Sequence, residues 1–164
     1  MNQKGFTVIE MAVIGAIVAV LAMIAIPNFQ IWVGNQRLRN SVAQLEGDLQ
    51  TARLTAINRN VPVTVLFNQA GSSYTVFIDD GSGGGTARNL AQDGTEQLLF
   101  PQRTLDAGVT FSAVNMTANA VLFNGKGLRW RPIADPASVT LKSSQNKKYC
   151  ITVTLVGDIN VALC

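Results

Sequence analysis

The residue with the most demanding chemistry in this 164-residue chain is Glu10, the one acidic side chain in an apolar run over residues 5–26. An ionised carboxylate costs roughly 2.5–3.5 kcal/mol at the centre of a bilayer. Glu10 therefore needs either a place near a membrane interface or a partner on another chain.

The remaining side chains do not combine into a catalytic or metal site. The chain contains no histidine, which removes the Ser-His-Asp and Cys-His nucleophile systems and the commonest zinc ligand. Its two cysteines, Cys150 and Cys164, are too few for a structural zinc site. No nucleophile, base and orienting group occur in a usable pattern, so we expect a protein that is not an enzyme and needs no metal or cofactor.

Two acidic residues, Asp79 and Asp80, open a stretch rich in glycine and serine that ends at Thr86. This composition predicts a flexible loop. The stretch lacks the Lys-Ser/Thr pair that completes a phosphate-binding P-loop. A solvated turn is the favoured interpretation, and calcium binding is the alternative, because calcium prefers clustered oxygen ligands on a bendable loop.

Cations adjoin aromatic residues at two places, residues 129–131 (Arg-Trp-Arg) and residues 147–149 (Lys-Lys-Tyr). Grooves for single-stranded nucleic acid use such neighbours. A tryptophan half packed into the domain, with two solvated arginines beside it, is the favoured interpretation of the first. The net charge of +3, with 14% charged residues, is not extreme. Nucleic acid is therefore not an expected partner.

The elements that position these residues begin with the apolar run. A helix over residues 5–26 rises about 30 Å, the thickness of a bilayer core. The run is longer than the apolar core of a secretory signal peptide and continues into the mature chain. Lys4 precedes it and the next basic residue is Arg37, which places the N-terminus in the cytoplasm and the rest outside. The two cysteines then lie in an oxidising compartment.

The sequence KGFTVIE at residues 4–10, followed by an uncharged helix and by AIPNF at residues 25–29, resembles the N-terminal signature of type IV pilins and type II secretion pseudopilins. The resemblance implies that a prepilin peptidase cleaves between Gly5 and Phe6, and that Phe6 becomes the N-methylated N-terminus. It also implies that Glu10 pairs with the N-terminal amine of a neighbouring subunit during filament assembly. A cationic amine on an adjacent helix offsets a buried carboxylate. An uncleaved signal anchor is the alternative.

The helix is expected to kink near Ile26, because Pro27 removes a backbone donor and clashes with the preceding turn, and then to continue to residues 58–60. Its second half carries apolar residues at spacings of 4, 3, 4, 3 and 4, on one helix face: Leu38, Val42, Leu45, Leu49, Ala52 and Ala56. This face should pack on a globular domain, with a free-standing coiled coil as the alternative. Pro62 biases the residue before it out of the helical region and ends the helix.

Strands rich in β-branched and aromatic residues are predicted at residues 61–67, 74–78, 96–100, 109–113, 120–123, 138–142, 149–155 and 159–163. The fold class is α+β: a long N-terminal helix, transmembrane in its first half and amphipathic in its second, packed on antiparallel β-sheet as in pilins. The predicted divisions are a cleaved leader at 1–5, a transmembrane helix at 6–26, its amphipathic continuation at 27–60 and a periplasmic β-rich domain at 61–164.

The last two predicted strands place Cys150 directly opposite Cys164. A three-residue loop at residues 156–158 pairs Ile151 with Leu163 and leaves one side of the hairpin wholly apolar. A two-residue turn would mix the two faces. Directly opposed residues lie ~4.5–5.5 Å apart at Cα, within the range that a disulfide accepts. A disulfide is therefore predicted, with two buried free thiols as the alternative.

Residues 54–64, LTAINRNVPVT, resemble the helix-to-strand junction of the GspH/FimT branch of minor pilins. The resemblance implies a minor pseudopilin of a type II secretion system, anchored in the inner membrane by a single pass and assembled with other pseudopilins, through its N-terminal helix, into a periplasmic pseudopilus. The alternative is a FimT-like minor pilin of a type IV pilus. Some of these resemble DNA-uptake receptors with a Gly-Arg-x-Arg motif. Here Gly157 is followed by Asp158, and Asn160 takes the place of the second arginine; an acid repels phosphate.

Overall fold

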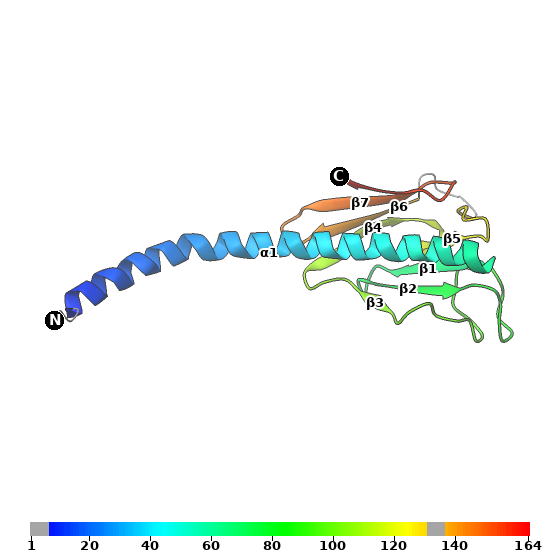
Figure 1. Cartoon of the computed structure of the whole chain (residues 1–164), viewed down its shortest axis with the longest axis horizontal. Helices are drawn as coiled ribbons and strands as arrows, with labels where there is room; N and C mark the ends of the chain where they lie inside the picture. Colours follow the sequence, from blue (N-terminus) through cyan, green and yellow to red (C-terminus); the bar gives the residue numbers. More distant parts are fainter. Residues whose placement is uncertain (1–6, 131–136) are drawn as a thin grey trace.

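The computed structural model describes residues 7–130 and 137–164. A single long helix, α1 (Val8–Arg59), extends far beyond the domain at its N-terminal end and lies along the domain with its C-terminal half (Figure 1). Within the described residues, eight β-strands in two antiparallel sheets and a short 3-10 helix follow. The predicted α+β fold, a long N-terminal helix packed on antiparallel sheet, is confirmed.

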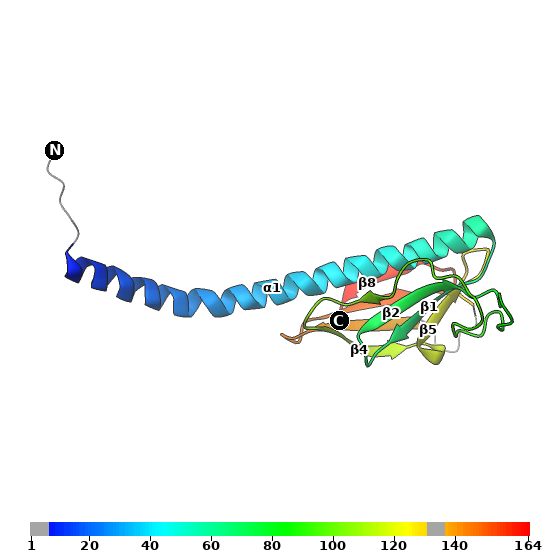
Figure 2. The same cartoon turned by 90° about the horizontal axis from the view of Figure 1, so that it is seen from below.

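Helix α1 begins and ends where local chemistry requires. Thr7 is its N-cap, and its side chain accepts a hydrogen bond from the backbone of Glu10. At the other end Asn60 adopts a left-handed conformation (φ 53°), and its N–H reaches the carbonyls of Ala56 and Ile57. The helix runs unbroken through Pro27, as expected. Figure 2 shows it curved along its length; the kink at Pro27 itself stays a prediction.

The buried residues of α1 lie in its C-terminal half and match the predicted stripe, with one addition: Leu38, Ser41, Val42, Leu45, Leu49, Ala52 and Ala56. The added residue, Ser41, is polar, and its buried hydroxyl is satisfied: Ser41 Oγ accepts a hydrogen bond from the N–H of Asp106 at 3.1 Å. The stripe therefore packs on the domain, which excludes the free-standing coiled coil.

The first sheet has the order β3-β2-β1-β5 and the second the order β4-β6-β7-β8. The first contains β1 (Val63–Asn68), β2 (Ser73–Ile78), β3 (Arg103–Thr104) and β5 (Ala120–Phe123). The second contains β4 (Val109–Asn115), β6 (Ala137–Ser143), β7 (Lys148–Val153) and β8 (Ile159–Leu163), and η1 (Thr117–Asn119) precedes β5. Seven of the eight predicted strands match observed ones to within two residues.

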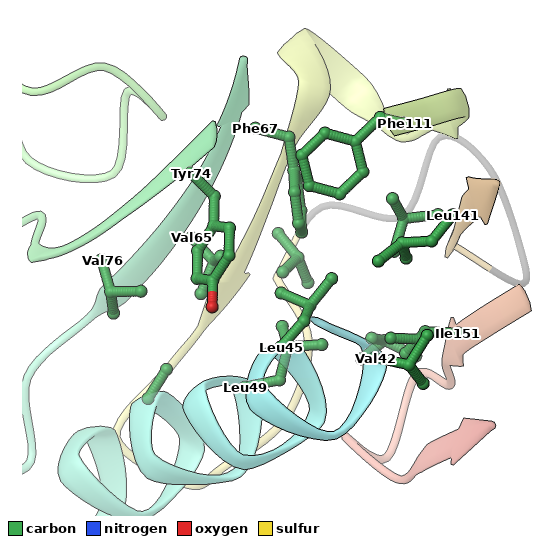
Figure 3. Close-up of a cluster of buried hydrophobic side chains, with 14 of the residues drawn as sticks. Val42, Leu45, Leu49, Val65, Phe67, Tyr74, Val76, Phe111, Leu141 and Ile151 are labelled. Atoms are coloured by element: carbon green, nitrogen blue, oxygen red, sulfur yellow. The ribbon is translucent and has the colours of Figure 1, made fainter. Parts of the chain in front are cut away.

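The hydrophobic core lies between the helix and both sheets. Figure 3 shows Leu45 and Leu49 of α1 directed into the space between the strands. Phe67 of β1 meets Phe111 of β4 edge to face, with ring centroids 5.6 Å apart, so the two sheets contact each other directly. The domain, and with it the second half of α1, is thus one packed unit.

The predicted strand at residues 96–100 is wrong. This segment meets β2 only at an isolated bridge between Leu98 and Phe77, and the short strand β3 pairs with β2 farther along. Two features oppose a continuous strand. Glu96 is buried and directs its carboxylate at two loop N–H groups, and Pro101, which has no N–H to donate, interrupts the ladder.

The predicted register of the last hairpin is also wrong, by two residues. Cys150 pairs with Ala162, not with Cys164. The loop has three residues as predicted, but they are residues 155–157, because Thr154 N bonds to the carbonyl of Asp158 at 2.9 Å. A three-residue loop ends with a residue in the left-handed region, and Gly157 (φ 84°) takes that position. A shift of two keeps the alternation, so the apolar face of the hairpin is retained.

Candidate functional site

The N-terminal half of α1 is the most unusual surface of the chain. Its best 18-residue window has a mean hydropathy of 2.7 and is 0% buried, which makes α1 long and apolar enough to cross a membrane. Large side chains stand free along it, including Val8 (89% exposed) and Met23 (76%). An apolar surface of this extent requires lipid or other apolar helices around it.

Glu10 is hydrogen-bonded within its own chain. Thr7 donates its backbone N–H (2.8 Å) and its hydroxyl (2.9 Å) to Glu10 Oε2, and the N–H of Glu10 returns to Thr7 Oγ1 at 3.3 Å. This capping box places a carboxylate at the positive end of the helix dipole. No hydrogen bond from the described residues reaches Oε1. Gly5 and Phe6 lie outside the described residues, so the cleavage site and the pairing of Glu10 with an amine stay predictions.

The disulfide between Cys150 and Cys164 is confirmed, with the Cα atoms 5.8 Å apart. Because Cys150 pairs with Ala162, the bridge runs diagonally to a residue just past the end of β8. That geometry is within the normal range for disulfides. The bridge fastens the end of the chain to β7.

Arg53 of α1 joins the helix to two loops. Its guanidinium donates to the carbonyls of Gly127 (3.2 Å) and Val156 (3.0 Å) and contacts the Asp158 carboxylate at 3.5 Å. The sequence shows Arg53 outside the apolar stripe but not what it binds. Asp158, at the first arginine position of the DNA-uptake motif, is therefore already paired with a cation.

Asp79 is completely buried, contrary to the predicted solvated turn. Its carboxylate accepts the Thr64 hydroxyl at 2.9 Å and the N–H groups of Leu90 (3.0 Å) and Asn89 (3.2 Å), so both oxygens are occupied. Within the described ranges, no three His, Cys, Asp or Glu side chains form a group that could hold a metal ion. Asp79 fixes the start and the middle of the loop to β1.

The rest of this loop is also organised by its acids. Asp80 accepts the N–H of Ser82 at 3.0 Å and its hydroxyl at 2.5 Å, and these bonds hold the pKa of Asp80 below its usual range. Glu96 accepts the N–H groups of Gly81 (3.0 Å) and Asp93 (3.1 Å). The glycine-rich stretch is thus a folded loop with internal hydrogen bonds.

A cation lies over the aromatic ring at each of the two places, Arg88 over Trp130 and Lys147 over Tyr149. Trp130 is 36% exposed, half packed as predicted, and the guanidinium of Arg88 lies 5.2 Å from the centre of its ring. Arg129 is only 8% exposed, so the prediction of a solvated arginine is wrong there, and Arg131 lies outside the described residues. Stacking of nucleic-acid bases needs open ring faces.

A long helix with a free apolar half, fastened by its other half to antiparallel sheets, defines a pilin-like subunit. Sequence comparison agrees: the family of type II transport protein GspH matches residues 41–157. The chain belongs to this family, which is a family of structural subunits and not of enzymes.

Two solved structures share the fold. The minor pseudopilin EpsH from the type 2 secretion system of Vibrio cholerae is 13% identical, with a TM-score of 0.55 over 77% of this chain and 97% of that one. The type IV minor pilin FimU of Pseudomonas aeruginosa is 12% identical, with a TM-score of 0.57 over 78% and 90%. Among curated proteins, a fimbrial protein of Pseudomonas aeruginosa is 32% identical over 103 residues, or 59% of this chain. The match spans 66% of that relative's length, just under two thirds.

Proposed function

We propose that this chain is a minor pseudopilin that supports protein secretion across the outer membrane as a subunit of a type II secretion pseudopilus. The observation that carries the proposal is the pairing of a GspH-family domain with a helix whose apolar half is entirely unburied in the single chain. Such a helix has two suitable environments, the bilayer and a bundle of identical or related helices. A pseudopilin passes from the first to the second as the filament forms.

In this proposal the helix spans the inner membrane, with its N-terminus in the cytoplasm and the β-rich domain in the periplasm. A prepilin peptidase removes residues 1–5, and Phe6 becomes the methylated N-terminus. Partner pseudopilins then cover the apolar half of α1, and Glu10 pairs with a neighbouring amine. The disulfide of Cys150 and Cys164 supports a periplasmic domain, because disulfides persist in oxidising compartments.

Two measurements test this function. Intact mass spectrometry of the membrane-extracted chain should give a mass that begins at a methylated Phe6, and a mass that retains residues 1–5 in cells with an active prepilin peptidase would contradict processing. Deletion of the gene should stop type II secretion while leaving pili intact, and complementation should restore it. Secretion that continues unchanged in the deletion strain would contradict the proposal.

A type IV minor pilin is the second candidate function. The 32% identity with a fimbrial protein and the fold shared with FimU favour it. If the chain is a type IV minor pilin, the same deletion strain should lose its pili and keep normal type II secretion. A DNA-uptake role gains no support, because Asp158 and Asn160 occupy the arginine positions and Arg53 engages Asp158.

A further inference from the structure

A cleft of about 410 Å³ lies where α1 leaves the domain. Figure 1 shows this end, where the helix extends past the β6–β7 turn. The helix contributes Phe29, Val33 and Arg37 to the cleft, and the loops at residues 107–108 and 144–145 form the opposite wall. The character of the cleft changes along the helix, from apolar side chains near the free half to a cation near the domain.

One side of the cleft is closed by a contact between α1 and the β6–β7 turn, and the other side is open to solvent at Arg37. Gly34 lies so close to the side-chain amide of Gln145 that a Cβ at residue 34 would overlap it, so the helix and the β6–β7 turn touch. Arg37 donates one long hydrogen bond, 3.4 Å, to the carbonyl of Ala107, and this is its one hydrogen bond within the described ranges. The exposed guanidinium therefore retains free donors for an anion.

The same end of the domain is strongly basic. Five cations belong to this end: Arg37 and Arg39 on α1, Lys147 in the β6–β7 turn, and Lys142 and Lys148 on the outer face of the strands next to that turn. Asp106 precedes the cleft loop at residues 107–108 and is bonded through its N–H to Ser41 of α1, so one acidic residue adjoins this end. Lys142 and Lys148 are direct cross-strand neighbours, and like charges in that arrangement destabilise a sheet. An anionic partner would relieve this repulsion.

The position of the cleft along α1 suits a membrane surface. Phe29 and Trp32 stack at 5.9 Å and are 63% and 61% exposed, just past the apolar run that ends at Ile26. Aromatic residues gather at membrane–water interfaces. Arg37 lies about 16 Å along the axis beyond Ile26. A headgroup layer about 5–7 Å thick reaches past Phe29, and the electrostatic field of its anions extends toward Arg37 over one further Debye length of about 8 Å.

We propose that this cleft and its basic rim bind the headgroup of an anionic phospholipid in the outer leaflet of the inner membrane. The headgroup enters the cleft from the membrane side, with its glycerol beside Phe29 and its phosphate toward Arg37. The inference rests on the proposed membrane position of α1. Lipid binding would hold the domain in one orientation on the bilayer before assembly. The subunit would lose this orientation when it is extracted into a filament.

The test uses the full chain in vesicles of phosphatidylcholine alone or of equal parts phosphatidylcholine and phosphatidylglycerol. Native mass spectrometry of the detergent-released protein counts the retained lipids, and acetylation with mass-spectrometric readout measures the accessibility of Lys142 and Lys148. The wild type should retain phosphatidylglycerol preferentially, and its two lysines should be protected only in the mixed vesicles. Arg37→Gln should weaken retention about fivefold. Arg59→Gln, an exposed cation at the far end of the same helix, is the matched control and should change nothing.

A second pair of variants separates charge from folding. The double variant Lys142→Gln/Lys148→Gln removes the repulsive pair, so it should weaken lipid retention without loss of stability. Lys126→Gln, which removes a cation elsewhere in the domain, should leave lipid retention unchanged. Equal retention of both lipids by the wild type, or equal weakening by Arg59→Gln, overturns the inference. Soluble glycerol phosphate retained as tightly as the lipid also overturns it.

Carbonate-resistant flotation is measured in parallel. A chain that floats with both vesicles but shows no preference for the anionic lipid refutes the cleft alone. A chain that floats with neither refutes the membrane position in the proposed function as well.

Discussion

The phenol of Tyr74 connects the first sheet to the helix through a charged hydrogen bond. Its hydroxyl donates to Asp48 Oδ2 at 2.6 Å, and Arg103 Nε lies 3.5 Å from the same oxygen. Tyr74 is 1% exposed. Burial, and then the hydrogen bond and charge of Asp48, raise the pKa of Tyr74 far above its usual value. The tyrosine therefore stays protonated in the fold over a range of pH above its usual pKa, where the free side chain already ionises.

Tyr74→Phe should lower the free energy of unfolding by about 1.5–3 kcal/mol, the range for a hydrogen bond to a charged group. The wild type should also lose stability above about pH 10, because the unfolded tyrosine then releases its proton while the folded one keeps it. This part of the alkaline loss should be absent in the variant. Urea unfolding of the detergent-solubilised chain, followed by near-ultraviolet circular dichroism, measures both effects.

Tyr149→Phe is the control, because the Tyr149 hydroxyl makes no hydrogen bond to the residues that the structure describes. Equal destabilisation by the two substitutions, or an unchanged alkaline slope in Tyr74→Phe, would show that the bond to Asp48 contributes little.

At the scale of the elements, two glycines have opposite roles. Gly47 lies in the middle of α1 with no atom within 4 Å of a built Cβ, whereas Gly157 has φ 84° and a Cβ there would overlap the carbonyl oxygen of Gly127. Gly47→Ala should therefore stabilise the domain by about 0.5–1 kcal/mol. Gly157→Ala should destabilise it by about 1–3 kcal/mol, the range for a left-handed residue with a side chain.

The two glycine variants share one substitution and one assay, so each controls for the other. A urea midpoint that rises in Gly157→Ala, as it should in Gly47→Ala, would contradict the assignment of Gly157 to the left-handed loop position. That result would favour the register with the loop at residues 156–158, in which Gly157 is a central loop residue.

The disulfide fastens the edge strand β8 to β7. Replacing both Cys150 and Cys164 by serine should lower the free energy of unfolding by about 3 kcal/mol, as the chain-entropy relation gives for a loop of this length. Reductant should reproduce the loss in the wild type and have no effect on the double variant. Titration of the denatured, unreduced chain should find no free thiol, and two free thiols per chain would refute the bridge.

The faces of the helix and the strands could be predicted because burial follows periods of 3.6 and 2 residues. The register of β7 against β8 could not, because a shift of two residues leaves the same faces buried. The signal that would have fixed the register is the positive φ of the last loop residue. Gly157 adopts this conformation most easily, so it takes that position. Direct and diagonal cysteine pairs both satisfy disulfide geometry, so the correct bridge did not reveal the wrong register.

The buried role of Asp79 could not be predicted from composition either. Its donors are Thr64 and the backbone of Asn89 and Leu90, which are brought to it only by the pairing of β1 with β2 and by the path of the loop. Sequence composition reports the average behaviour of a segment. A single buried carboxylate reverses that behaviour when enough donors surround it.

At the scale of the whole molecule, the chain separates anchoring from assembly. The domain fixes the second half of α1, and the first half exposes an apolar surface that carries Glu10 near its N-terminal end. Glu10 has two separable properties, an acceptor that caps the helix through Thr7 and a negative charge. Only the charge suits pairing with an amine on another subunit.

Three variants separate these properties. Glu10→Val should leave membrane insertion intact or improve it, because it removes a charge that costs up to roughly 2.5–3.5 kcal/mol at the bilayer centre. It should nevertheless abolish incorporation into the filament. Glu10→Gln keeps an acceptor for Thr7 and loses the charge, so it should fail in incorporation as well. Thr7→Val removes the hydroxyl and keeps the charge, and it should assemble.

Insertion is measured by carbonate-resistant membrane association, and incorporation by co-purification with partner pseudopilins and by secretion. If Glu10→Gln assembles and Thr7→Val does not, the capping box is the essential feature and the charge is dispensable. If both variants fail while both insert normally, assembly requires the cap as well as the charge. Failure of Glu10→Gln alone is the result that the proposed ion pair requires, because a neutral amide in the same place, with the same cap, then lacks only the attraction to a neighbouring cation.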